Sequence, residues 1–223
     1  MGNAETEAVE RKLLVVRERL NASLSTAPSG IVTILPDFGP ARAAMLLVER
    51  ELAQAKGEEY AAPFNFPVQW DIGAPLPVLI ANDYKTFLIF YVRFVDPNWD
   101  GTYMTLRESA NPTSEPMALV KFEGCTSAKL GAPNEEVFSG HPLYGKGLEG
   151  YTVQIVHNSR WAAELERVNQ VHSLYNADRW RDAKHFVFWF HDSTFECVAD
   201  SYQVEVLQKP LAEILAIAYE RMI

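Results

Sequence analysis

Residues 185–200 decide the fold, with the sequence His-Phe-Val-Phe-Trp-Phe-His-Asp-Ser-Thr-Phe-Glu-Cys-Val-Ala-Asp. Aromatic and β-branched residues favour the pleated surface of a strand. Asp192 and Ser193, in the middle, are typical of a tight turn. The stretch therefore predicts an antiparallel β-hairpin with a two-residue turn, in which Glu196 faces Trp189.

The predicted hairpin has two chemically different faces, because alternate residues of a strand point to opposite sides. One face, the aromatic face, has no polar member and should form core: Phe186, Phe188, Phe190, Phe195, Cys197 and Ala199. The other, the mixed face, combines aromatic and polar side chains: His185, Val187, Trp189, His191, Thr194, Glu196, Val198 and Asp200. A three-residue loop would mix the two sets, so their segregation favours the two-residue turn. We expect functional groups of the hairpin on the mixed face.

Composition is typical of a globular protein and excludes several classes of function. The chain has 223 residues, 48% of them hydrophobic, and can bury a core without a metal or disulfide. Its net charge of −9 repels phosphate backbones, so we expect no nucleic-acid binding. No apolar run approaches the roughly 20 residues of a membrane span. Cys125 and Cys197 are expected to be free thiols, and we predict a cytoplasmic protein.

Hydrophobic periodicity predicts helices at residues 5–24, 40–56, 159–172 and 210–222. Short apolar segments predict strands at residues 31–35, 78–82, 86–95, 103–107, 117–122, 151–157 and 204–207. The predicted fold class is α+β, with an antiparallel sheet, helices packed mainly on one face of it, and an N-terminal helical element. Residues 1–60 would form that element, docked on a single α+β domain at 61–223. Its first helix has a narrow apolar stripe, which favours packing on its own domain or, alternatively, a homodimer through this helix.

Residues 124–150 are the longest segment without clear periodicity, and long loops in compact domains are often functional. The heptapeptide Gly-His-Pro-Leu-Tyr-Gly-Lys at 140–146 matches the start of a phosphate-binding loop, but Gly147 stands where Ser or Thr is required. We therefore expect no nucleotide site there. The candidate binding residues are His141, Lys146, Trp189, His185 and Asp200.

The five histidines do not predict a metal site. His185 and His191 are six residues apart, which places them about 20 Å apart on an extended strand. Two ligands of one zinc ion each lie only about 2 Å from it. We predict no metal and no cofactor.

The mixed face carries the best candidate for acid–base chemistry. His191 and Glu196 lie near the predicted turn, with Trp189 beside both. Desolvation by the indole would raise the pKa of Glu196 toward the range useful for proton transfer, and Asp192 would orient His191. His191, Glu196 and Asp192 are therefore the candidate catalytic residues. In the alternative interpretation Asp192 caps the turn and Glu196 is a cross-strand polar partner.

Three segments carry a resemblance: Phe-His-Asp-Ser-Thr-Phe-Glu-Cys at 190–197, Gly-His-Pro-Leu-Tyr at 140–144 and Trp-Ala-Ala-Glu-Leu-Glu at 161–166. Over about residues 140–207 the chain resembles soluble bacterial proteins described as uncharacterised. The resemblance implies a bacterial cytoplasmic setting and no particular activity. Two functions stay open. The first is a non-catalytic domain that binds a protein partner or a small molecule. The second is a small-molecule enzyme using His191 and Glu196.

Overall fold

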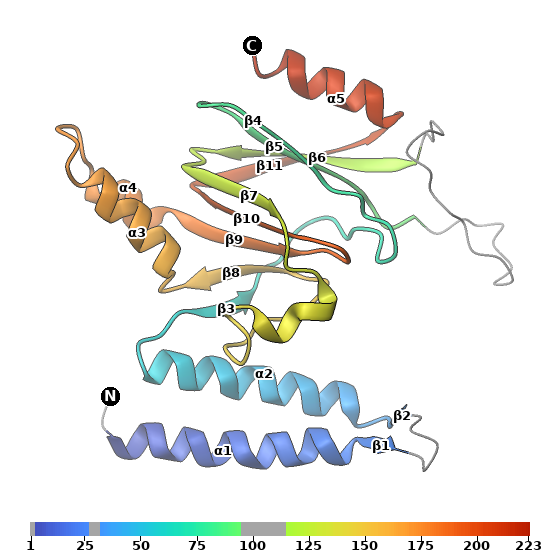
Figure 1. Cartoon of the computed structure of the whole chain (residues 1–223), viewed down its shortest axis with the longest axis vertical. Helices are drawn as coiled ribbons and strands as arrows, with labels where there is room; N and C mark the ends of the chain where they lie inside the picture. The colour runs from blue at the N-terminus through green and yellow to red at the C-terminus, as the bar shows by residue number, and fades with distance from the viewer. Residues whose placement is uncertain (1–2, 27–31, 95–114) are drawn as a thin grey trace, which may run out of the picture.

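The computed structural model describes residues 3–26, 32–94 and 115–223 (Figure 1). Its helices are α1 (Asn3–Ala22), α2 (Phe38–Ala55), α3 (Arg160–Asn169), α4 (Ala177–Asp182), α5 (Leu211–Glu220) and the 3-10 helix η1 (Glu135–Gly140). Its strands are β1 (Leu24–Thr26), β2 (Val32–Ile34), β3 (Tyr60–Pro63), β4 (Val78–Ala81), β5 (Thr86–Tyr91), β6 (Pro116–Glu123), β7 (Ser127–Gly131), β8 (Val153–His157), β9 (Lys184–Trp189), β10 (Thr194–Ala199) and β11 (Ser201–Gln208). The α+β class with an N-terminal helical element is confirmed.

Two antiparallel sheets form the body of the protein (Figure 1). The first has the strand order β3-β8-β9-β10-β7, and the second has the order β11-β6-β5-β4. Between them lies the main hydrophobic core, in which the aromatic face of β9 and β10 meets Leu88 and Phe90 of β5 and Phe122 of β6. Sheets that pack face to face bury the inward-pointing half of each strand, so this contact fixes which residues of the hairpin are interior.

The β9–β10 hairpin is confirmed, but its predicted register is wrong by two residues. Thr194 lies opposite Trp189 and Glu196 lies opposite Val187, so residues 190–193 form the connection. The Phe190 N–H donates to the Ser193 carbonyl oxygen at 3.0 Å, so the turn lies one residue earlier than predicted, at His191 and Asp192. Phe190 stays on the core side, where its ring centroid is 4.9 Å from that of Trp70. Because the shift is an even number of residues, the two faces keep their predicted members. All six residues of the aromatic face are at most 1% exposed.

The arrangement of layers differs from the predicted single sheet with helices mainly on one face. The aromatic face is covered by the second sheet, and the helices are distributed over the outer surfaces. α5 packs outside the second sheet, where Ile214 and Ala218 contact Phe87 and Ile89 of β5. α3 lies outside the first sheet, beside β9 (Figure 1). The apolar segments of β5 and β6 do not show from sequence which face meets a sheet and which a helix.

The mixed face of the hairpin is buried rather than open to solvent. Trp189 is 1% exposed, and residues after β7 cover it: Phe138, Leu143 and Leu148 pack into one cluster with Val187 and Trp189. The segment at 124–150, expected to be a functional loop, therefore contains a strand, a 3-10 helix and this cover. Functional groups of the hairpin must reach solvent at the rim of the cover.

The N-terminal helices form a hairpin attached to the body through α2 (Figure 1). Val9 and Leu13 of α1 pack on Val48 of α2. The Arg50 guanidinium donates to the carbonyl oxygens of Ala61 and Gly147, each at 2.9 Å. Two carbonyl groups from distant segments are thus held by one side chain of α2.

Several elements were not predicted. β1, β3, β7 and α4 are short, with three to six residues each, and none of them has a clear periodic pattern in the sequence. The strand predicted at 103–107 lies outside the described residues. No helix in the described part of the chain is long and apolar enough to cross a membrane.

Candidate functional site

A buried carboxylate, that of Glu196, is the centre of the polar groups on the mixed face. Glu196 is 5% exposed. Its Oε1 lies 2.8 Å from Lys129 Nζ and 3.7 Å from His141 Nε2, and its Oε2 lies 2.9 Å from His185 Nε2. These partners come from β7, from the segment after η1 and from β9. The contacts therefore bring together three residues that were selected from the sequence: His141, His185 and Glu196.

The charge of Glu196 is stabilised by these contacts. Burial alone would raise its pKa, but hydrogen bonds from His141, His185 and Lys129 outweigh burial and hold the pKa well below the usual range. The expectation that the pKa of Glu196 is raised toward neutrality is therefore wrong. Glu196 stays ionised near neutral pH, so it orients and stabilises a neighbouring group rather than transferring protons.

His185 connects Glu196 to a serine hydroxyl. Its Nδ1 lies 2.8 Å from Ser159 Oγ. The ionised carboxylate of Glu196 only accepts hydrogen bonds, so His185 Nε2 carries the hydrogen. In the neutral imidazole this leaves Nδ1 as the acceptor for the hydroxyl of Ser159. The chain Ser159–His185–Glu196 therefore runs in the order of hydroxyl, imidazole and carboxylate.

Ser159 also has a structural role as the N-cap of α3. Its Oγ accepts the Ala162 N–H at 3.1 Å, which satisfies one of the N–H groups that the first turn leaves unpaired. The sequence offers either Asn158 or Ser159 as the cap of this helix, and the structure has Ser159 in that position. The cap places the hydroxyl at the start of α3, directly over β9.

Trp161, the second residue of α3, packs against the imidazole of His185 and contacts the ammonium group of Lys129, whose side chain is 59% exposed. Its ring centroid is 5.1 Å from that of His185, at an interplanar angle of 78°. Lys129 Nζ lies 4.8 Å from the centre of the Trp161 ring, a cation–π distance. Reduced access of water strengthens the contact between the buried His185 and Glu196 side chains.

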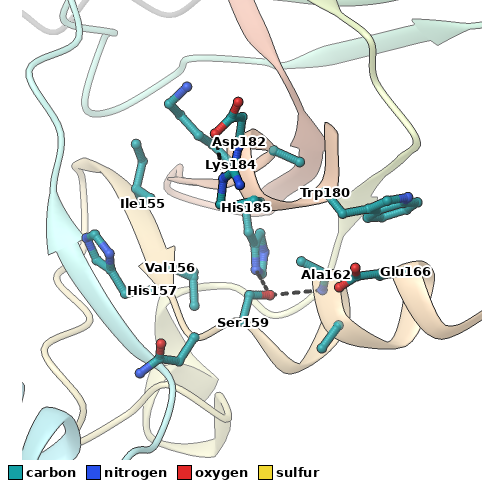
Figure 2. Close-up of a pocket in the computed structure, with 14 residues that line it drawn as sticks. Ile155, Val156, His157, Ser159, Ala162, Glu166, Trp180, Asp182, Lys184 and His185 are labelled. Atoms are coloured by element: carbon teal, nitrogen blue, oxygen red, sulfur yellow. Dashed lines mark hydrogen bonds and ion pairs between the residues drawn. The ribbon is translucent and has the colours of Figure 1, made fainter. Parts of the chain in front are cut away.

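Ser159, which carries the hydroxyl, borders a cleft of about 700 Å³ (Figure 2). We call it the α3–α4 cleft. Residues 155–159, 180–185 and the inner side of α3 line it. Ser159 and His185 form part of its wall, with Trp180 and Glu166 on the side of the helices and His157 opposite them (Figure 2). Its size lies in the range typical of small-molecule sites, which are mostly apolar with a few convergent polar groups.

His191 and Asp192, two of the three predicted catalytic residues, lie together but in a different place. His191 Nδ1 is 2.8 Å from Asp192 Oδ1, and its Nε2 is 3.3 Å from Glu135 Oε1. The hydrogen bond with Asp192 raises the pKa of His191. The structure does not add Glu196 to this group, because in the observed register Glu196 lies opposite Val187, farther from the turn than predicted. The catalytic roles of these residues stay predictions.

The remaining candidate binding residues serve the framework in the structure. Trp189 is buried, with its ring centroid 4.6 Å from that of Phe138. Lys146 Nζ is 3.2 Å from Glu58 Oε2 and ties the cover to the connection between α2 and β3. The carbonyl oxygen of Asp200 accepts from Lys184 Nζ at 3.1 Å, at the margin of the cleft.

Metal-ligating and sulfur groups form no further site in the described residues. Among them, no group of three or more His, Cys, Asp or Glu side chains is arranged to hold a metal ion. Cys125 and Cys197 are free thiols, as predicted. A hydrogen bond with the thiol of Cys197 lowers the pKa of Cys125 to about 7.

Sequence reasoning missed Ser159 as a functional candidate and missed Lys129 altogether. In the sequence, Ser159 is one of two possible caps of a helix and shows no other functional signal. Lys129 carries no signal, because only the pairing of β7 with β10 places it opposite Glu196. Comparison of the chain with protein-family models, with curated proteins and with solved structures gives no match. The resemblance to bacterial proteins stays a prediction.

Proposed function

We propose that this protein binds a small molecule in the α3–α4 cleft. One observation carries the proposal: a cleft of about 700 Å³ has two buried polar side chains, Ser159 and His185, in its wall. The aliphatic and aromatic walls formed by Ile155, Val156 and Trp180 suit an apolar body. The serine hydroxyl and the imidazole suit a carbonyl-containing head. Such a ligand would be held at one end by hydrogen bonds and elsewhere by burial of its apolar surface.

N-Phenylbutyramide, which has an apolar body and one carbonyl group, is a suitable probe. Isothermal titration should detect its binding, and Ala163→Trp should abolish it because Ala163 lines the cleft. Val168→Trp is the matched control, since Val168 lies on the same helix, is 58% exposed and does not line the cleft. Absence of binding, or binding that Ala163→Trp leaves unchanged, would refute the proposal. Native mass spectrometry of the freshly purified protein would identify a natural ligand.

We also propose that the outer face of α1 pairs with a second copy of the chain. Leu14 and Val15 are 62% and 64% exposed. At 100° per residue, Arg11 and Glu18 lie on the same face, on either side of this pair. In an antiparallel arrangement centred between Leu14 and Val15, Arg11 of each copy lies opposite Glu18 of the other. The face is thus self-complementary in charge, as a two-fold interface requires.

The charge pattern gives a direct test of this homodimer by sedimentation equilibrium. Arg11→Glu should weaken association, because it places two acidic side chains opposite each other in both halves. The double variant Arg11→Glu with Glu18→Arg should restore association. A monomeric wild-type protein, or a double variant no better than the single one, would contradict this arrangement.

For the location of the protein we propose the cytoplasm. Two free thiols, one of them fully buried, support a reducing compartment. Thiol titration of protein purified without reductant tests this, and an intermolecular or internal disulfide in the cell would contradict it.

A further inference from the structure

We propose that Ser159 is a nucleophile that small carboxylic esters acylate in the α3–α4 cleft, with His185 as its base and Glu196 as the positioning carboxylate. This inference rests on the proposed function, because the ester must first bind in the cleft. It goes further, because it assigns a reaction and a substrate class to the site.

Ser159, His185 and Glu196 have the order and spacing of a nucleophile, its base and an orienting carboxylate. A serine hydroxyl becomes a nucleophile when a base within hydrogen-bond reach removes its proton and a third group orients that base. Here the two distances are 2.8 Å from Ser159 Oγ to His185 Nδ1 and 2.9 Å from His185 Nε2 to Glu196 Oε2. The nitrogen that faces the serine is Nδ1. It can take the proton of the hydroxyl, because either ring nitrogen of a neutral imidazole can be the acceptor.

The permanent charge of Glu196 is what the reaction needs. When His185 takes the proton of Ser159 it becomes an imidazolium ion, and the carboxylate at its other nitrogen stabilises that ion. Lys129 and His141 keep the carboxylate ionised, as described above. Glu196 acts through His185 and touches no reacting atom, so it is a positioning residue.

The proposed reaction balances with water as the second reactant. Ser159 Oγ bonds to the ester carbonyl carbon while its proton moves to His185 Nδ1. The carbon–oxygen bond to the alcohol then breaks, and the imidazolium returns the proton to the departing alkoxide. Water attacks the acyl-serine, gives one proton to His185 Nδ1 and forms the carboxylic acid. His185 finally returns this proton to Ser159 Oγ.

The start of α3 supplies stabilisation for the negative charge on the carbonyl oxygen. A helix N-terminus favours an anion, through its dipole and its unpaired N–H groups. The Arg160 N–H already donates to Glu59 Oε2 at 3.0 Å, and the Ala162 N–H donates to Ser159 Oγ. We assign the Trp161 N–H, between them, to the developing oxyanion.

Acylation by p-nitrophenyl butyrate, followed by nitrophenolate release and by intact-protein mass, tests the inference. An alkyl fluorophosphonate, which modifies activated serine hydroxyls with loss of fluoride, serves as a second probe. Ser159→Asn should lower the acylation rate by at least about 10³-fold, and it should still fold because Asn caps helices as well as Ser does. Ser193→Asn, in the β9–β10 connection, is the matched control and should acylate at the wild-type rate.

Glu196→Gln gives a readout that a purely structural role would not move. It should lower kcat about 10²–10⁴-fold with little change in KM, and the pH profile of acylation should change with it. An adduct on Ser159 that Ser159→Asn removes would support the inference. Absence of an adduct in protein that still binds N-phenylbutyramide in the cleft would overturn the nucleophile and leave the binding function standing. Absence of both would overturn both, and an adduct on another residue would overturn the assignment of Ser159.

Discussion

Replacing Glu196 by Gln should destabilise the protein by about 3 kcal/mol. The variant keeps the shape of the side chain but removes the charge that accepts from Lys129 at 2.8 Å and from His185 at 2.9 Å. The NH₂ group of the Gln side chain then faces one of these two donors, which loses its acceptor. Losing a hydrogen bond to a charged group costs about 1.5–3 kcal/mol, and a buried donor left without an acceptor adds to that cost. Lys129 is 59% exposed and water replaces its lost contact, whereas His185 is buried, so we expect the upper end of this range, a melting temperature lower by about 6–12 °C.

The pH dependence distinguishes the lost charge from a packing defect. Because the pKa of Glu196 in the folded protein lies well below its ordinary value of 4.5, the ionised group stabilises the folded state at any pH above the unfolded-state pKa. This contribution is lost as the pH falls through the folded-state pKa. The difference in unfolding free energy between wild type and variant should be largest near neutral pH. Below about pH 4.5 it should shrink by about 1.4 kcal/mol per pH unit.

Urea unfolding at pH 7 and pH 3.5, followed by tryptophan fluorescence, measures both effects. Glu205→Gln is the matched control, because Glu205 is half exposed and pairs with Arg221 at 2.7 Å. A surface pair of this kind contributes less than about 1 kcal/mol. The reasoning is refuted if Glu196→Gln costs no more than the control at pH 7, or if its cost is the same at both pH values.

Three further outcomes follow from the core, the cover and the surface. Phe188→Ala, at a fully buried position, should lower the unfolding free energy by about 3–5 kcal/mol in urea titrations. Gly147→Ala should cost about 2–3 kcal/mol in thermal melts, since Gly147 has a φ of +80° and a Cβ there would lie 2.7 Å from a backbone carbonyl oxygen, whereas Gly140→Ala, with nothing within 4 Å, should be near neutral. The NMR titration of His191 should give a pKa above its ordinary 6.5, lowered again by Asp192→Asn. The pair stabilises the protonated form, so its contribution is present below the unfolded-state pKa and is lost as the pH rises through the folded-state pKa.

The aromatic face of the hairpin could be predicted from sequence because it depends on a period of two and not on the turn. Phe186 and Phe195 are buried together although each has a different partner from the one predicted. The position of the turn could not be predicted, because shifting the strand pairing by two residues leaves both faces of the hairpin unchanged. The second sheet could not be predicted either, because strands such as β5 are apolar on both sides.

Most residues of the candidate site could be selected from the sequence, but the contacts between them could not be predicted. His185, His141 and Glu196 were each selected from sequence, but Glu196 was paired with His191. The partner that fixes its charge, Lys129, comes from a strand too weak in pattern to predict. Ser159 was one of two possible caps, and its second contact depends on the packing of α3 over β9.

Burial of β9 and β10 on both faces determines how this protein exchanges its amide hydrogens with deuterium. Each of the two strands is also paired along both edges, β9 with β8 and β10, and β10 with β9 and β7. Their amides are exposed only when the whole sandwich opens, so their exchange rate measures the free energy of global unfolding. A few peptides from residues 184–199 would therefore report the stability of the entire fold.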